Sequence, residues 1–260
     1  MVAISSSGST RPGVRRSPVE IVATMGMFLT RMPAAEFYGL RTGRFGQWAD
    51  GVTAMREDCA SFAGYWRTHN ESVLAAGGGP LWVVLGDSTA QGLGAPTPDL
   101  GYVGQVLSGL RLRTGLPWRV LNLSVSGSVI RDVLSRQLPA LPARPDLVTC
   151  GIGVNDILYN APGKLFGDLR SLLTAVPDGT VLLDLPVPAG VWGLLGRASV
   201  PYVARINRVI HQVAGTRGLP VARVSEQFTA PWTGKFASDR FHPSQDGYRD
   251  WTRALLTAIA

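Results

Sequence analysis

The sequence predicts an α/β fold in which helices cover both faces of a parallel sheet, forming a three-layer α/β/α sandwich. From residue 81 onward, short apolar runs alternate with longer helix-like stretches. This alternation is typical of parallel strands joined by right-handed helical crossovers. Apolar residues make up 45% of the 260-residue chain and charged residues 17%, so the chain can bury a core of the size that this fold needs.

Five short apolar runs are the expected strands, and the stretches between them are the expected helices. The strands are predicted at 81–85, 119–125, 146–152, 180–187 and 219–224. The helices are predicted at 101–113, 127–138, 164–176, 201–217 and 243–259. In such sheets ligands bind at the carboxyl ends of the strands, so functional residues are expected directly after the apolar runs.

The residues before the sheet divide into a tail and a helical extension. Residues 1–16 are rich in Ser, Gly and Arg and are predicted to be disordered, whereas 17–80 form a helical extension. Within it, 46–75 predicts a helix that Gly51 and Gly64 could bend or split. Its apolar stripe could pack on the main domain, act as a lid over the site or form a homodimer face. The stripe consists of Trp48, Val52, Met55, Cys59, Phe62, Trp66, His69 and Val73.

The N-terminal apolar stretch 21–29 follows Arg15 and Arg16 and faintly resembles a signal peptide. No small-residue cleavage site follows it, and it is too short to span a bilayer. We therefore predict a cytoplasmic protein without a transmembrane segment. The alternative is that this stretch lies against a membrane or against the protein itself. The two cysteines, Cys59 and Cys150, form neither a disulfide framework nor a zinc-binding spacing, which suits a reducing compartment.

The net charge of +7 comes almost entirely from arginine, because Lys164 and Lys235 are the only lysines among 25 basic residues. The arginines either lie scattered over the surface or favour an anionic ligand, which a guanidinium can bind through two hydrogen bonds. No compact basic run suggests nucleic-acid binding.

A candidate nucleophile follows the first expected strand. In Gly86-Asp87-Ser88 the serine comes three residues after the apolar run and is expected to begin a helix. A helix N-terminus offers free N–H groups and a partial positive charge, which can support an oxyanion. The alternative is that Asp87, Ser88 and Thr89 only cap the helix.

A candidate base lies near the end of the chain. His242 follows Asp239 by three residues, in a loop before Pro243, and an aspartate so placed can hold Nδ1–H of the imidazole. The other two histidines suit this role less well. His211 is expected on the polar edge of the 201–217 helix, and His69 is expected buried or half-buried in the 46–75 helix.

Two further segments offer hydrogen-bond donors for a tetrahedral intermediate. Ser126-Gly127 offers a backbone N–H, and Gly153-Val154-Asn155-Asp156 offers the side-chain amide of Asn155. With the N–H of Ser88, these would make an oxyanion hole of three donors. We expect Asp87 and Asp156 to hold loop hydrogen bonds instead. The sequence contains no histidine pair or carboxylate cluster with metal-ligand spacing, so we predict neither a metal nor a cofactor.

These segments resemble, in chain order, the motifs of the SGNH or GDSL-like hydrolase superfamily over residues 81–260. The resemblance implies a flavodoxin-like sandwich with five parallel strands and a catalytic triad of Ser88, Asp239 and His242. It also implies an oxyanion hole of Ser88, Gly127 and Asn155, and a serine mechanism without a cofactor. Thr89 stands where the GDSL motif has leucine, and we expect this departure to affect the pocket rather than the chemistry.

The resemblance leaves the acyl acceptor open. Family members hydrolyse esters of lipids, sugars and acyl-CoA, and some transfer the acyl group to a sugar hydroxyl. The chain is also similar to actinobacterial members that transfer octanoyl from octanoyl-CoA to glucosylglycerate-type precursors of methylglucose lipopolysaccharide. We favour transfer from acyl-CoA to an acidic sugar, with a plain esterase as the alternative. A catalytically inactive binding protein on the same fold is the third hypothesis.

Overall fold

A computed structural model describes residues 45–187 and 193–259, with the backbone alone described at 45–57 and 193–198. The predictions for the 1–16 tail and for the apolar stretch 21–29 lie outside the described residues. No helix in the described ranges is long and apolar enough to cross a membrane.

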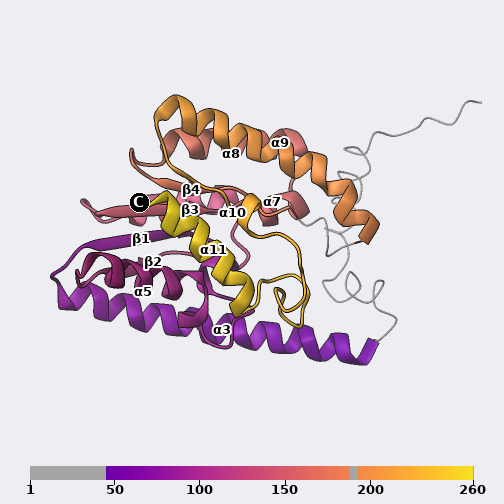
Figure 1. The fold of residues 1–260 in the computed structure, drawn as a ribbon, viewed down its shortest axis with the longest axis horizontal. Helices are drawn as coiled ribbons and strands as arrows, with labels where there is room; N and C mark the ends of the chain where they lie inside the picture. The colour runs from indigo at the N-terminus through magenta and orange to yellow at the C-terminus, as the bar shows by residue number, and fades with distance from the viewer. Residues whose placement is uncertain (1–44, 188–192, 260) are drawn as a thin grey trace, which may run out of the picture.

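The sheet has five parallel strands in the order β2-β1-β3-β4-β5. This order and the helices on both faces confirm the predicted flavodoxin-like sandwich (Figure 1). The strands are β1 (Leu81–Gly86), β2 (Arg119–Asn122), β3 (Leu147–Gly151), β4 (Val181–Leu183) and β5 (Val221–Ala222). Since β1 lies between β2 and β3, the residues that follow β1 lie between those that follow β2 and β3 at the carboxyl ends of the strands.

The helices bury two apolar clusters, one on each face of the sheet. One face carries α6 (Ile130–Asp132), α8 (Pro162–Ala175) and α9 (Gly193–Arg217). The other carries α3 (Phe45–Ala76), α5 (Tyr102–Thr114) and α11 (Gln245–Ala258) (Figure 1). The short helices α4 (Ser88–Gln91), α7 (Val154–Tyr159) and α10 (Val224–Gln227) follow β1, β3 and β5.

The element boundaries differ from the prediction at several places. Strands β2 and β5 cover only 119–122 and 221–222 of the predicted runs 119–125 and 219–224. The stretch 127–138 is not one α-helix: α6 is followed by a π-helical segment and then a 3-10 turn that contains Pro139, which has no N–H to continue the ladder. Helix α9 begins at Gly193 and runs through Pro201 instead of starting there. Strand β4 is short because Leu185 pairs with the side-chain amide of Asn207, whose two hydrogen bonds to its backbone both measure 2.8 Å.

Helix α3 is continuous from Phe45 to Ala76, without a break at Gly51 or Gly64. Of the predicted stripe, Phe62, Trp66 and Val73 are buried, while Cys59 and His69 are half-buried. The side chains of Trp48, Val52 and Met55 lie outside the described residues. The described part of the stripe therefore packs on the sheet domain, and the roles as a lid or a dimer face stay predictions.

The contacts of α3 close one edge of the sheet. Strand β2 is an edge strand, and the Asn70 side chain binds both backbone groups of Asn122, accepting from its N–H at 2.9 Å and donating to its carbonyl at 2.7 Å. One residue earlier in α3, His69 Nε2 lies 3.1 Å from the carbonyl of Val120. Side chains of the helix thus bind backbone groups of β2 that would otherwise face an adjacent strand.

Candidate active site

Ser88 is the first residue of α4, directly after the turn that ends β1. The residue that caps this helix is Asp87, whose Oδ1 accepts from the backbone N–H of Thr89 at 3.0 Å and from its hydroxyl at 2.8 Å. Burial raises the pKa of Asp87, although the two Thr89 hydrogen bonds and the nearby His242 oppose this rise. With the cap supplied by Asp87, the Ser88 hydroxyl is available for another partner.

That partner is His242, which lies 154 residues further along the chain. Ser88 Oγ is 2.8 Å from His242 Nε2, and His242 Nδ1 is 2.6 Å from Asp239 Oδ2. Ser88 and His242 are both buried, with 7% and 4% of their surfaces exposed. When the aspartate accepts a hydrogen bond from Nδ1–H, Nε2 is left as an acceptor for the serine hydroxyl.

The backbone around Asp239 orients its carboxylate. Oδ1 accepts from the N–H groups of Phe241 and His242 at 2.8 and 3.0 Å, which leaves Oδ2 for the imidazole. Arg240 makes this turn possible with a left-handed φ of 56°, which is uncommon for a residue other than glycine. Burial alone would raise the pKa of Asp239, but the hydrogen bond and charge of His242 and the two N–H groups outweigh it, and the net pKa is lowered.

The two predicted donor segments lie beside each other. Asn155 is buried in α7, and its Nδ2 donates to the Ser128 carbonyl at 2.8 Å, which ties it to the residue after Gly127. Gly127 has a φ of +80°, and a Cβ there would meet no atom within 4 Å, so the backbone conformation rather than crowding favours glycine. Within the described residues, neither the Gly127 N–H nor the Ser88 N–H has an acceptor.

Two buried polar residues support these segments, and the role of one of them was expected from the sequence. Gln137 binds both backbone groups of Gly86, each at 2.9 Å, and so fixes the end of β1. Nothing in the sequence around Gln137 indicated that its side chain would bind β1. Asp156 is fully buried and, as expected, holds loop hydrogen bonds: it accepts from the Ile130 N–H at 2.9 Å and from the Asn160 side chain at 2.7 Å.

Asp156 makes the stability of the protein pH-dependent. Burial raises its pKa to about 6, with the hydrogen bonds from Ile130 and Asn160 opposing the rise. The folded state therefore binds this proton more tightly than the unfolded chain, so this contribution to stability is present below pH 4 and is lost as the pH rises through about 6.

We expect Asp156→Asn to remove this loss. Relative to wild type, the free energy of unfolding of the variant should improve by roughly 2 kcal/mol between about pH 4.5 and pH 7.5. Urea denaturation at both pH values measures the difference, with the exposed Asp246→Asn as the control. An equal difference between variant and wild type at the two pH values would contradict the assignment.

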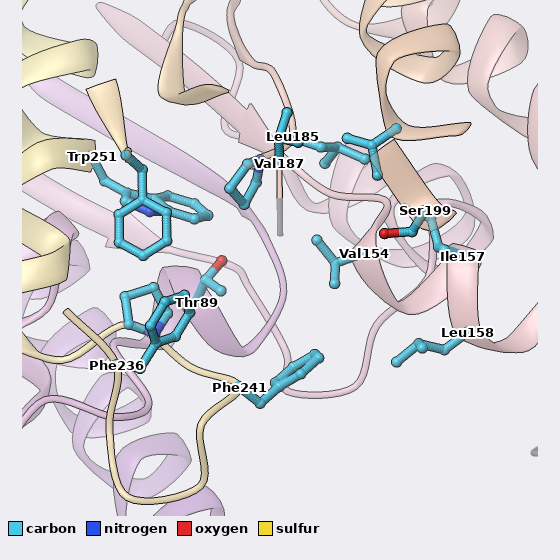
Figure 2. A pocket seen from close by; sticks show the side chains of 14 residues that line it. Thr89, Val154, Ile157, Leu158, Leu185, Val187, Ser199, Phe236, Phe241 and Trp251 are labelled. Carbon is cyan, nitrogen blue, oxygen red and sulfur yellow. The ribbon is translucent and has the colours of Figure 1, made fainter. Parts of the chain in front are cut away.

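An apolar cavity adjoins the Ser88–His242 pair. Three of its lining residues, Thr89, Val154 and Phe241, are chain neighbours of Ser88, Asn155 and His242, and Figure 2 shows them around one space. Thr89 therefore lies where its departure from the family motif was expected to matter. The empty volume is about 750 Å³, open mouth included. The rest of the lining consists of Ile157, Leu158, Leu185, Pro186, Val187, Ser199, Val203, Phe228, Phe236, Pro243 and Trp251.

The remaining histidines and the buried thiol serve the fold. His69 is half-buried against β2, and His211 contacts the buried Asp184 at 3.1 Å, also from a half-buried position. Burial raises the pKa of Cys150 to about 12, so its thiol is not an ionised nucleophile. In the described ranges, no three His, Cys, Asp or Glu residues come together as a group that could hold a metal ion.

Comparison with known proteins identifies the family. Residues 84–249 match the GDSL-like lipase/acylhydrolase family. The match spans most of the chain and includes Ser88, Gly127, Asn155, Asp239 and His242. The chain belongs to this family. As a GDSL-like (SGNH) protein it is an ester hydrolase enzyme. Helix α3 lies outside the matched region, before its first residue.

Solved structures share the fold. The crystal structure of TesA is 25% identical, with a TM-score of 0.56, and the match covers 69% of this chain and 97% of TesA. Axe2, an acetylxylan esterase from Geobacillus stearothermophilus, is 24% identical, with a TM-score of 0.57 and coverage of 71% and 95%. Phospholipase A1 from Streptomyces albidoflavus NA297 is 20% identical, with a TM-score of 0.51 and coverage of 70% and 100%. A search of curated proteins found no match.

Proposed function

We propose that this GDSL-like enzyme cleaves carboxylic esters through an acyl-Ser88 intermediate. The observation that carries the proposal is the unbroken chain of contacts from Ser88 through His242 to Asp239, at 2.8 and 2.6 Å. Ser88 Oγ attacks the ester carbonyl while His242 Nε2 takes the hydroxyl proton. Asp239 holds the resulting imidazolium.

The tetrahedral intermediate then places a negative oxygen near the donor groups. The N–H groups of Ser88 and Gly127, with the second N–H of the Asn155 amide, stabilise this oxyanion. When the intermediate collapses, the C–O bond to the alcohol breaks and His242 returns its proton to the leaving oxygen. A water molecule, activated by His242, then attacks the acyl-serine and releases the carboxylic acid with Ser88 restored.

Labelling of the wild-type protein tests the nucleophile directly. A fluorophosphonate should modify a single residue, and peptide mass spectrometry should locate the label on Ser88. Labelling of a different residue, or none while p-nitrophenyl esters are hydrolysed, would contradict the assignment. Complete absence of both labelling and turnover would favour the inactive binding protein.

The apolar cavity suggests the acyl part of the substrate. Its lining carries almost no polar groups and includes Thr89, the residue after Ser88, so an acyl chain could enter it as the carbonyl reaches the serine. Burial of each methylene contributes about 0.8 kcal/mol. A chain of medium length, such as octanoyl, would gain more from this cavity than an acetyl group.

We expect Leu158→Trp to shorten the preferred acyl chain. Leu158 lines the cavity from α7, and the larger indole fills part of the space that a long chain would occupy. The kcat/KM for p-nitrophenyl octanoate should fall about tenfold or more, while that for the acetate changes little. Tyr159→Trp is the matched control, because Tyr159 is the exposed neighbour in the same helix. An equal effect on both esters would argue against the cavity as the acyl site.

Transfer of the acyl group to a sugar is a second candidate function. A separate hollow beside Gly127 is lined by polar and charged side chains that include Ser126, Ser128, Asp132 and Arg136. Its lining follows β2, whereas that of the apolar cavity follows β1, β3, β4 and β5, and Ser88 follows β1, the strand beside β2. Such a hollow suits a hydroxylated acceptor, and Arg136 suits the carboxylate of an acidic sugar such as a glucosylglycerate.

Mass spectrometry separates the two functions. Octanoyl-CoA is incubated with the enzyme and a panel of neutral and acidic sugars. An octanoylated sugar that forms faster than free octanoic acid would support transfer. Free octanoic acid as the sole product across the panel would support the esterase.

A further inference from the structure

Helix α3 reaches two segments that carry the proposed oxyanion donors. Trp66, which is 3% exposed, donates from Nε1 to the carbonyl of Gln91 at 2.9 Å, at the end of the helix that Ser88 begins. On the same face of α3, the half-buried Cys59 thiol lies near Ser126, the residue before Gly127. A helix outside the family match thus holds the end of α4, the helix that Ser88 begins.

Gln91 connects the two donor segments through its side chain. It lies one helical turn after Ser88 and is 3% exposed. Its Nε2 donates to the Ser124 carbonyl at 3.0 Å, and its Oε1 accepts from the Ser126 hydroxyl at 2.6 Å. The amide therefore holds the loop after β2 at two points, immediately before Gly127.

We propose that Gln91 is a positioning residue for the oxyanion hole, held in place by Trp66 of α3. This inference rests on the proposed function, because it concerns the distance between the N–H groups of Ser88 and Gly127. One donor belongs to the helix that contains Gln91, and the other belongs to the loop that Gln91 binds. A small error in their spacing weakens transition-state stabilisation while leaving ground-state binding in the apolar cavity unchanged.

The burial of this bridge favours a single arrangement. Gln91 and Trp66 are both almost fully buried, and water has little access to replace either hydrogen bond. Asn122 reinforces the same region: its Nδ2 donates to the Ala90 carbonyl at 2.8 Å, and its Oδ1 accepts from the Ser124 hydroxyl at 2.6 Å. The last two carbonyls of α4, those of Ala90 and Gln91, thus each have a partner although the helix has ended.

Gln91→Leu tests the proposal, since leucine is of similar size but removes both loop contacts. We expect kcat for p-nitrophenyl butyrate to fall about 10- to 100-fold, with KM within about threefold of wild type. The matched control is Gln105→Leu. Gln105 also joins two segments through its amide, donating to the carbonyls of Leu100 and Gln245 at 2.7 and 3.1 Å, but it does not touch the loop after β2.

Inhibitor binding separates positioning from general destabilisation. An alkyl trifluoromethyl ketone forms a tetrahedral oxyanion on serine, so its Ki for Gln91→Leu should rise by the factor by which kcat/KM falls. Gln105→Leu should keep the wild-type kcat and Ki even if its Tm falls equally. Trp66→Phe keeps the ring without the donor, and a three- to tenfold loss of kcat is expected.

Hydrogen exchange provides a readout that does not depend on turnover. Mass spectrometry should show faster amide exchange over residues 123–128 in Gln91→Leu and Trp66→Phe, but not in Gln105→Leu. If Gln91→Leu does not fold, Ser126→Ala removes one of the two loop bonds with a smaller change and is measured instead. The inference would be overturned if this loop exchanged at the wild-type rate in Gln91→Leu. It would also be overturned if Gln105→Leu lost as much kcat as Gln91→Leu for the same fall in Tm. Absence of wild-type turnover would overturn the proposed function instead, and the exchange data would still decide whether Gln91 holds the loop.

Discussion

Ser88→Ala and His242→Ala should each lower kcat for p-nitrophenyl esters by roughly 10⁴-fold or more. Ser88→Ala removes the proposed nucleophile, and His242→Ala removes the proposed acceptor for its proton. Since the two residues act as a unit, the double variant should be little worse than either single variant. The measurement is the steady-state rate of p-nitrophenol release.

The structure offers matched controls for both substitutions. Ser225 donates to Asp184 at 2.7 Å, and His211 contacts the same carboxylate at 3.1 Å. These residues form a serine, histidine and aspartate cluster in which the aspartate, not the histidine, lies in the middle. Ser225→Ala and His211→Ala should keep kcat near wild type. Near-normal activity of Ser88→Ala or of His242→Ala would refute the acyl-serine mechanism.

Asp239→Asn should lower kcat by about 10⁴-fold near neutral pH, although it barely changes the size of the side chain. The asparagine oxygen can keep the two backbone N–H bonds that Oδ1 accepts. Its NH₂ group then faces His242 Nδ1, whereas the carboxylate had accepted a hydrogen bond from Nδ1–H. Nδ1 must become the acceptor, which moves the ring proton to Nε2 and leaves no acceptor for the Ser88 hydroxyl.

The kinetics distinguish this tautomer effect from a folding defect. KM should change far less than kcat, because Asp239 is not among the residues that line the apolar cavity. Asp184→Asn is the comparison: it alters a buried carboxylate that also holds a histidine but no nucleophile. That variant should lose stability while keeping its kcat. A kcat loss below about tenfold for Asp239→Asn would show that the carboxylate does not set the tautomer.

The parts of this enzyme that depend on local pattern could be predicted from its sequence. Apolar runs with short lengths located all five strands, and turn residues after them located Ser88, Gly127 and Asn155 at one edge. The relation between Asp239 and His242 was also predictable, because both lie in one tight turn. In each of these cases the information is contained within a few consecutive residues.

The parts that depend on distant side-chain pairing could not be predicted in this way. Gln91 and Gln137 look like ordinary helix residues, yet their amides bind backbone groups 33 and 51 residues away. The end of β4 depends on Asn207 in α9. Its side chain binds the backbone N–H and carbonyl of Leu185, which a neighbouring strand would otherwise bind. Composition and periodicity do not reveal which polar side chain will satisfy which buried backbone group.

The cover that α3 places over β2 bears on how far the chain can be shortened. A sheet edge with unpaired N–H and C=O groups can pair with the same edge of another molecule, which leads to aggregation. Asn70 and His69 occupy those groups at Asn122 and Val120, and both lie before the region that the family defines. A fragment of residues 77–259, which omits α3 but keeps β1 and α11 whole, would retain every proposed catalytic group, but it would uncover this edge and most of the surface buried by Trp66. Self-association, rather than loss of chemistry, is the failure to expect from such a fragment.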